Sequence, residues 1–584
     1  MAATPAILAA CGGTAAVSTS ASAAPASPSS AAARASASTL ASAPASGSVA
    51  ASPAAPASPK PSSASKLQLP TYTPANGPKP DVPGSDVLPD AFVNYPKTPF
   101  QSVPKPPGDG GDVTVAGETF APLIPLDQNT LWQNLNKAMN VNLKLNLAPF
   151  SDWAFGKFQA YVAGGDLADI TMIPIGGVIP DLPQFLDTKA QDLTPFVGGD
   201  NVKEFPNLAA LPTVGWKGMV YNGKIFAVPI SQSLFYWALW GHQELLEQNN
   251  LNWPTDAASF KNALQKLTVP GQTKFGIGFE VGNRYAFALT NVGGQLWPAL
   301  QGAPNTWAVD KSGKFTKDYE TDQFKAAVQM ARDFYAAGVY DPDTSYTTPS
   351  ADVAFETGRL AFRFDGAIVP NNFDAGEIPN HPYTPTKTPP WKIRLAPPFS
   401  ASPSIKPQYN YGPGNFGLII LKKAPSERIK LLLNVINYIV APFGSQEYLN
   451  AQYGVQGKDY DFDANGNPVR NKQGTQDIIA WNGVMGTPPP VIFDPNNKDF
   501  APTMSAALKA LGQGGVLDAS LGLYSPTNQK SGFLVQQKFA DAMIDIVTGR
   551  RPFSDYDGVL KDWQTSGGNT IKTELAQAYS ALNG

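Results

Sequence analysis

The chain has 584 residues and nearly balanced charge, with 43 Lys and Arg against 46 Asp and Glu and a formal net charge of −3. It carries no basic block, which argues against nucleic acid as a main partner. Its single cysteine excludes an intramolecular disulfide, and two histidines offer no zinc-binding spacing. Charged residues make up only 15% while aromatic residues reach 11%, so flat apolar side-chain faces are plentiful.

The chain opens with a short apolar stub that ends in the only cysteine, Leu8-Ala9-Ala10-Cys11. This arrangement resembles a bacterial lipobox, in which the cysteine becomes the lipidated N-terminus of the mature protein. We therefore expect residues 1–11 to be the remnant of a lipoprotein signal, with Cys11 anchoring an exported protein to the outer face of the cytoplasmic membrane. The stub lacks the Lys or Arg of a secretory signal, so a chance cysteine in an Ala-rich stretch stays open as the alternative.

Residues 12–108 have the composition of a disordered tether followed by a Pro-rich lead-in. Between residues 12 and 59 the only charged residue is Arg34, and the first aromatic residue is Tyr72. Such a sequence has almost nothing to bury and cannot offset the entropy of ordering itself. The later part of the segment carries Phe92, Tyr95 and Phe100, which could dock it onto a folded body.

The folded body, residues 110–584, exceeds the size of an ordinary single core, so at least two lobes are expected. Its first part alternates between strand and helix patterns. Strands are predicted at 113–120, 141–147 and 169–174, and helices at 129–139 and 153–163. This βαβ alternation predicts an α/β sheet.

The alternation breaks at the hairpin signal Asn222-Gly223. A strand through 235–240 follows, then a helix at 243–249 and another that begins after an N-cap at Thr255 or Asp256. Further on, the patterns predict an amphipathic helix at 322–337, a strand leading to residue 366, and a buried helix that contains 431–440 and is capped by Ser426. The apolar run in this last helix falls short of the ~18 residues that span a membrane.

The motifs tested for chemistry mark no catalytic or metal site. Gly-x-Ser-x-Gly is absent, two histidines leave little material for a Ser-His-Asp arrangement, and no glycosidase-like pair of carboxylates stands out. Residues 461–466 match the opening of an EF-hand loop, but Lys472 stands where the bidentate Glu is needed, so we predict a hairpin tip. Residues 412–417 match GxGxxG but lead into a strand, so we predict a turn.

What remains is an exported, two-lobed α/β protein that is rich in Trp and Tyr. Sugar rings have apolar C–H faces and polar rims, and proteins hold them with aromatic platforms and a few Asp, Asn, Arg or Gln side chains. The composition therefore suits a carbohydrate-binding cleft, with core packing accounting for most of the aromatic residues.

A series of short segments between residue 95 and the end of the chain has a recognisable order and spacing. They are 95–99, 105–108, 165–170, 222–229, 338–342, 355–359, 453–457, 562–568 and 573–574. The most specific is 222–229, NGKIFAVP, and in 165–170 Ala168 replaces the usual Pro. On these segments the chain resembles the family 1 bacterial extracellular solute-binding proteins. These are the maltodextrin-binding-like lipoproteins that feed ABC importers, here in the larger subgroup of Gram-positive bacteria and actinobacteria.

The resemblance implies a two-lobed, periplasmic-binding-protein-like α/β fold of the class II type, with the ligand in a cleft between the lobes. Lobe 1 would hold residues 110–230 and 418–488, and lobe 2 residues 231–417 and 489–584. The resemblance also implies a sugar or oligosaccharide ligand, ABC importer permease subunits as partners, and a monomer that is not an enzyme and uses no cofactor. Residues 267–272 are too short and uncharged for the calcium loop of many subgroup members, so we predict no metal there.

The residues expected to contact the ligand come from the positions that the family uses and from the aromatic residues. They are Ser231, Gln232, Ser233, Asn283, Tyr285, Asp365 and Tyr524, with Trp153, Trp237 and Trp307 as stacking platforms. The hinge would cross at Ser231-Gln232-Ser233. Asp365 ends a strand in which Phe362 and Phe364 should face the core and Arg363 and Asp365 the other side. Two alternatives stay open, a binding protein for peptides or another solute and a secreted carbohydrate-active enzyme.

Overall fold

A computed structural model describes residues 67–583, apart from 120–121, 175–178, 180, 273, 279–287, 291–294, 343–353, 356, 367–391, 480–482 and 496. These residues belong to one compact unit, and it contains two main β-sheets. No helix in the described ranges is both long and apolar enough to cross a bilayer. Cys11, the expected signal remnant and most of the expected tether lie outside the described residues.

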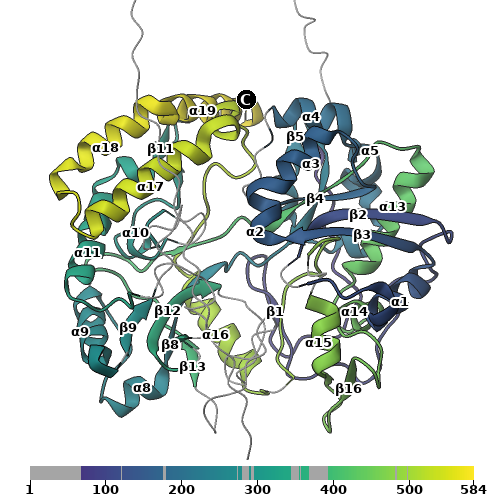
Figure 1. Ribbon diagram of the computed structural model, residues 1–584, viewed down its shortest axis with the longest axis horizontal. Coiled ribbons are helices and arrows are strands. Elements are labelled where there is room, and N and C mark those ends of the chain that lie inside the picture. Colours follow the sequence, from purple (N-terminus) through teal and green to yellow (C-terminus); the bar gives the residue numbers. More distant parts are fainter. Residues whose placement is uncertain are drawn as a thin grey trace, which may run out of the picture. The chain divides into compact units, whose positions relative to one another are not determined.

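The first main sheet has five strands in the order β3-β2-β4-β15-β7. Figure 1 shows β3, β2 and β4 on one side of the molecule. β2 (Asp112–Thr119) pairs in parallel with β3 (Asn142–Pro149) and with β4 (Ile170–Pro174). β15 (Asn415–Leu421) runs antiparallel to β4 and to β7 (Ala227–Ser231), so β7 runs in the same direction as β2. The three strands predicted in this part of the chain are confirmed, with small shifts at their ends.

Helices share one hydrophobic core with the first sheet. α1 (Thr130–Met139) is capped by the Asn129 side chain, which accepts a hydrogen bond from Trp132 N. The helix predicted at 153–163 is present, but its first turn, Trp153–Lys157, is a π-helix that precedes α3 (Phe158–Gly164). α13 (Ser426–Ile439) contains residues 431–439 of the predicted run, most of them buried, but its N-cap is Pro425. The prediction of Ser426 as the cap was wrong, because Ser426 is already helical and the extended Pro425 sets the helix start.

The second main sheet has the order β13-β8-β12-β9. β12 (Leu360–Gly366) runs parallel to β9 (Phe275–Gly278) and antiparallel to β8 (Trp237–His242), which pairs on its other side with β13 (Ile393–Leu395). A second core joins this sheet to α9 (Ala257–Leu267), α10 (Leu296–Leu300), α11 (Asp322–Ala336) and α17 (Phe533–Val547). Asp256 caps α9 in a capping box with Ser259, which confirms one of the two predicted caps.

Two chain segments run side by side between the main sheets. Residues 232–236 connect the end of β7 to the start of β8, and residues 411–414 lead from β14 (Tyr409–Asn410) into β15. The backbone N–H of Gln232 donates to the Gly414 carbonyl at 3.1 Å, and that of Gly412 donates to the Leu234 carbonyl at 2.8 Å. A Cβ at Gly412 would lie 2.5 Å from Tyr236 Cβ, so this close approach requires glycine. The GxGxxG stretch is the predicted turn before a strand.

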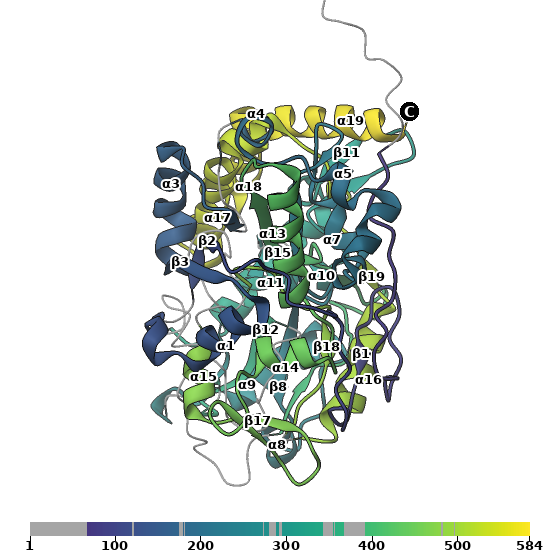
Figure 2. The ribbon, with the colours of Figure 1, turned by 90° about the vertical axis from the view of Figure 1, so that its right-hand side faces the viewer.

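Residues 67–103, which we call the lead-in strap, dock onto the folded body (Figure 2). At the start of the strap, Thr71 N donates to the Gly199 carbonyl at 3.0 Å. In the middle, β1 (Asp90–Ala91) pairs with β18 (Val491–Ile492), and Leu88 and Ala91 join a hydrophobic cluster that includes Trp240 of β8. The strap therefore contacts the elements around both main sheets.

The last part of the strap is held by aromatic packing and by one buried carboxylate. The rings of Phe92 and Phe443 stack with 4.4 Å between their centroids, and Tyr95 packs in the same cluster. Glu447 accepts hydrogen bonds from Ser102 N at 2.9 Å, Ser102 Oγ at 2.8 Å and Val103 N at 3.1 Å. This agrees with the docking predicted from the aromatic residues of the segment.

The other elements are mostly short. The remaining α-helices are α2 (Phe150–Asp152), α4 (Leu182–Lys189), α5 (Thr194–Val197), α6 (Pro206–Ala209), α7 (Thr213–Lys217), α8 (Gln243–Gln248), α14 (Gln446–Gln452), α15 (Lys472–Ile479), α16 (Phe500–Gly512), α18 (Tyr556–Trp563) and α19 (Asn569–Asn583). The remaining strands pair as β5 (Val220–Tyr221) with β6 (Lys224–Ile225), β10 (Trp307–Val309) with β11 (Phe315–Lys317), β14 with β19 (Gly515–Val516), and β16 (Tyr460–Phe462) with β17 (Pro468–Arg470).

Asn222 and Gly223 connect β5 to β6 with φ angles of 49° and 70°, and Asp463 lies at the tip between β16 and β17. Both hairpin predictions are confirmed.

Candidate functional site

The parallel strands of the first sheet end at one edge. β2 ends at Thr119, β4 at Pro174 and β7 at Ser231. The chain passes from β2 to β3 on one side and then to β4 on the other, so the direction in which strands are added reverses at β2. Open α/β sheets bind ligands in the crevice outside the carboxyl ends of their strands at such a reversal. We call these strand ends the carboxyl edge of the first sheet.

The predicted contact segment Ser231-Gln232-Ser233 lies at this edge. Ser231 is 6% exposed, and its carbonyl accepts a hydrogen bond from Thr487 Oγ1 at 2.5 Å. Ser233 Oγ accepts one from Phe235 N at 3.1 Å. In contrast, the buried atoms Ser231 Oγ and Gln232 Oε1 have no hydrogen-bond partner among the described residues. Buried polar atoms are costly to leave unbonded, so these two are open to a ligand or to water.

The second sheet brings Trp237 and Asp365 to one of its edges. Gly366 at the end of β12 lies opposite Trp237 at the start of β8, and Asp365 lies opposite Ala238. Only residues 232–236 separate Trp237 from Ser231, so the two edges meet at this crossing. Trp237 is half-buried, and its ring stacks on that of Phe364 with 5.9 Å between the centroids.

The predicted alternation along β12 is present. Phe362 is a member of the second core and Phe364 packs against it. Arg363 is 6% exposed and forms an ion pair with Asp365. Asp365 therefore lies at the edge, as the sequence predicts, but its carboxylate is already engaged with a buried cation.

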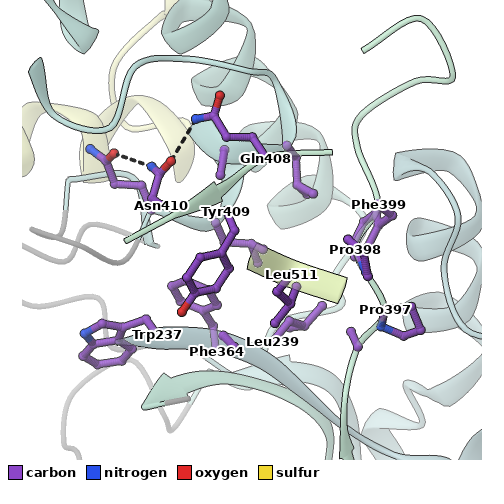
Figure 3. Close-up of a pocket in the computed structure, with 16 residues that line it drawn as sticks. Trp237, Leu239, Phe364, Pro397, Pro398, Phe399, Gln408, Tyr409, Asn410 and Leu511 are labelled. Atoms are coloured by element: carbon purple, nitrogen blue, oxygen red, sulfur yellow. Dashed lines mark hydrogen bonds between the residues drawn. The ribbon is translucent and has the colours of Figure 1, made fainter. Parts of the chain in front are cut away.

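A pocket of about 50 Å³ lies beside Trp237 (Figure 3). Its walls are mainly apolar and include Trp237, Leu239, Phe364 and Phe399. This volume is far below the ~300–1,000 Å³ of pockets for drug-sized ligands. The pocket therefore lies beside the edge of the second sheet and is too small to hold a sugar chain by itself.

One wall of this pocket is a chain of amides that ends in a buried ion pair. Gln408 Nε2 donates to Asn410 Oδ1 at 2.8 Å, and Asn410 Nδ2 donates to Gln295 Oε1 at 3.1 Å (Figure 3). Gln295 Nε2 donates in turn to Asp318 at 2.6 Å. Asp318 is fully buried and pairs with Lys317 at 2.6 Å, and burial raises the pKa of Asp318 against the effect of Lys317.

The other predicted contacts lie in several places. Trp153 is 3% exposed and its Nε1 donates to the Met172 carbonyl at 3.2 Å. Trp307 is 7% exposed and packs in the second core. Tyr524 meets Tyr221 edge to face, with 6.3 Å between the ring centroids. Asn283 and Tyr285 lie outside the described residues. The structure thus brings Ser231, Gln232, Ser233, Trp237 and Asp365 to the meeting edges and places Trp307 in a core.

One polar residue at the carboxyl edge was missed by the sequence analysis. Glu118, the penultimate residue of β2, is 1% exposed, and neither of its carboxyl oxygens has a hydrogen-bond partner among the described residues. Burial raises the pKa of Glu118 to about 8, because the charged form loses its hydration. The one signal in the sequence was a carboxylate placed directly after the mostly apolar residues 113–117 of the predicted strand.

Comparisons with known proteins bear on the fold. No family model matches the chain. The polygalacturonan/rhamnogalacturonan-binding protein YtcQ of Bacillus subtilis (strain 168) is 20% identical over 397 residues, which cover 65% of this chain and 75% of that protein. An extracellular solute-binding protein from Bifidobacterium longum subsp. infantis superposes with a TM-score of 0.58 at 11% identity, over 81% of this chain and 98% of the other. The S. pneumoniae ABC-transporter substrate-binding protein FusA, in complex with kestose, gives 0.56 at 13% identity, over 81% and 99%. These likenesses confirm the predicted two-lobed α/β fold.

Proposed function

We propose that this protein, which has the fold of the extracellular solute-binding proteins, captures a sugar or oligosaccharide between its lobes and delivers it to an ABC importer. The name of YtcQ and the kestose bound to FusA support a carbohydrate ligand. One observation in this chain carries the proposal. The unbonded polar atoms of Ser231 and Gln232 lie where the two sheets meet, a few residues before Trp237, whose ring stacks on that of Phe364.

This combination suits the chemistry of a sugar. The apolar C–H face of a sugar ring packs on an aromatic ring, and the hydroxyl groups on its rim need hydrogen-bond partners. Trp237 supplies a half-buried aromatic face. Ser231 Oγ can donate or accept a hydrogen bond, and Gln232 Oε1 can accept one.

We assign residues 110–230 and 418–488 to lobe 1, and residues 231–417 and 489–584 to lobe 2. The support is that each set contains one main sheet. Because Ser231 ends β7 and Asn415 starts β15, both in the first sheet, we move the first boundary to just after Ser231 and the second to just before Asn415. The paired crossings 232–236 and 411–414 would be the hinge. Closure would be favoured to the extent that the ligand binds the closed state more tightly than the open one.

We propose ten ligand contacts. They are Trp153, Ser231, Gln232, Ser233, Trp237, Asn283, Tyr285, Trp307, Asp365 and Tyr524. Within this set Ser231, Gln232 and Trp237 have the strongest support from the described residues. Trp153 and Trp307 are buried, so stacking by either would require a conformation that exposes it.

We further propose that Cys11 carries a lipid and that the protein works as a monomer at the outer face of the cytoplasmic membrane. The permease subunits of the importer would be its protein partners. Mass spectrometry of the protein extracted from membranes would detect the lipid on Cys11, and a Cys11→Ala variant should be released into the medium. Retention of that variant on the membrane would refute the anchor.

The ligand class is tested by thermal unfolding of the full chain with kestose, mannosyl and galactosyl oligosaccharides, oligogalacturonide and, as controls, tripeptides. A ligand at ~100 times its dissociation constant adds about 2.7 kcal/mol to the free energy of unfolding, which gives a clear shift. We expect a shift with a glycan that is recovered intact. Cleavage of the glycan would indicate an enzyme, and a shift with peptides alone would refute the sugar assignment.

A matched pair of Trp variants tests the site. Trp237 begins β8, whereas the half-buried Trp253 lies near the other end of that strand, 2.8 Å from a Cβ built on Gly241. We expect Trp237→Ala to weaken glycan binding about tenfold, as the loss of ~1.4 kcal/mol of stacking would. Trp253→Ala should keep the affinity. Equal losses in both variants would mean that Trp237 does not contact the glycan.

A further inference from the structure

Glu118 lies where two strands of the first sheet separate. The pairing of β2 with β4 stops at Ala116 and Thr171, although β4 continues to Pro174. Side chains alternate along a strand, so Glu118 points away from the face of Gly117. That face is closed, because a Cβ on Gly117 would lie 2.4 Å from Val484 Cγ2.

Trp153 links the two strands on either side of β2. Its helix follows β3, its Nε1 donates to the Met172 carbonyl of β4, and β2 lies between those two strands. Glu118 thus lies at the carboxyl edge of the first sheet, on the strand between the two that Trp153 links. The same edge holds the unbonded atoms of Ser231 and Gln232.

Resting on the proposed sugar-binding function, we propose that Glu118 contacts the ligand and, in its ionised form, accepts hydrogen bonds from sugar hydroxyl groups and so selects an uncharged sugar unit over a uronic acid. The two carboxyl oxygens are buried and lack partners among the described residues, so a ligand reaches them in a conformation that opens this edge. An ionised carboxylate only accepts hydrogen bonds, and adjacent hydroxyl groups on a sugar ring can donate two. A uronate placed there would bring a second carboxylate against the first.

The charged groups on the elements next to β2 offer no compensation for a uronate. Burial alone accounts for its shifted pKa. The titratable side chains on β3, α2, the π-helix and α3 all have partners of their own. Lys144 pairs with Asp112 at 3.9 Å, Lys157 pairs with Asp152 at 2.9 Å, and the Tyr161 hydroxyl accepts from Ala168 N at 2.6 Å. At the facing edge, Arg363 pairs with Asp365.

Calorimetric titration of the full-length protein tests this inference. The wild type, Glu118→Gln and Glu447→Gln are titrated at pH 6 and pH 9 with kestose, mannosyl oligosaccharides, and an α-1,4-linked galacto-oligosaccharide and oligogalacturonide of equal length. The last two probes differ only in a hydroxymethyl group against a carboxylate. Glu447 is the matched control, a buried glutamate whose carboxylate is fully hydrogen-bonded to the lead-in strap.

We expect the neutral glycan that binds the wild type to bind Glu118→Gln about tenfold more weakly at pH 9, where the wild-type carboxylate is ionised, and about equally at pH 6. At pH 9 the wild type should prefer neutral glycans over oligogalacturonide by at least about tenfold, and Glu118→Gln should reduce that preference. Glu447→Gln should match the wild type in both respects.

Other outcomes separate this inference from the proposed function. Glycan binding that is equal in the wild type and Glu118→Gln at both pH values would overturn the role of Glu118 and leave the sugar-binding function standing. Oligogalacturonide binding at pH 9 as tightly as any neutral glycan would overturn the selectivity. No binding of any glycan to the wild type would overturn the proposed function and this inference with it.

Discussion

Glu118→Gln is expected to stabilise the ligand-free protein, and to do so only above the ordinary carboxyl pKa of 4.5. Glutamine has nearly the shape of a protonated glutamate and does not titrate. In the folded protein burial raises the pKa of Glu118 from 4.5 to about 8. The folded state therefore holds a proton that the unfolded state releases between these two values, and the stability contributed by this group falls as the pH rises through that window. Each pH unit corresponds to about 1.4 kcal/mol, so the wild type should lose roughly 3 kcal/mol by pH 7 relative to the variant.

Urea unfolding at pH 4, 5, 6, 7, 8 and 9 measures this effect as the difference in free energy between the wild type and Glu118→Gln. The difference should be near zero at pH 4, grow to about 3 kcal/mol at pH 7 and level off above pH 8. A difference that stays constant with pH would refute the reasoning, because it would mean that Glu118 is not buried without partners. Glu447→Gln should instead be less stable than the wild type throughout.

Three further substitutions have expected outcomes. Glu447→Gln leaves donors of the lead-in strap poorly satisfied, which should lower the free energy of unfolding by about 2 kcal/mol in urea titrations; an unchanged value would mean that the strap contributes nothing. Lys317→Met leaves the buried carboxyl of Asp318 without its cation and should destabilise by about 3–5 kcal/mol at pH 7. This loss of stability should be smaller in urea titrations at acid pH, because protonation removes the charge of Asp318. An equal loss at pH 7 and at acid pH would contradict this expectation. Gly412→Ala forces a Cβ against Tyr236 and should lower the stability by about 1–3 kcal/mol in thermal unfolding, whereas a neutral result would show that the crossing segments move apart easily.

The sequence predicted the first strands and helices of the first sheet well, because they follow each other closely and each has a regular hydrophobic periodicity. The hairpin at Asn222-Gly223 and the cap at Asp256 were predictable for a local reason, since turn and cap chemistry depends on a few adjacent residues. The cap at Ser426 was wrong by one position because an extended proline can also start a helix, and nothing in the apolar pattern distinguishes the two.

The candidate site was predictable only in part. Ser231 and Gln232 were predicted from the contact positions of the family that the chain resembles, and Trp237 was predicted as an aromatic platform. The structure places all three at one chain crossing. Burial was not visible. Trp153 and Trp307 read as candidate platforms, yet hydrogen bonding to Met172 and packing in the second core bury them. Glu118 was overlooked because a glutamate at a strand end is ordinarily solvated, and its burial depends on elements from distant parts of the chain.

The lead-in strap also constrains the order in which the chain folds. Tyr95 packs against Phe443 and Phe493, and β1 pairs with β18. The ribosome adds these partners more than 300 residues after the strap. Contacts between such distant segments form late, because a long loop must close before they are gained. We therefore expect a newly made chain to pass through a stage in which both sheets exist and the aromatic cluster around Phe443 is still uncovered, open to a chaperone or a protease until the strap closes over it.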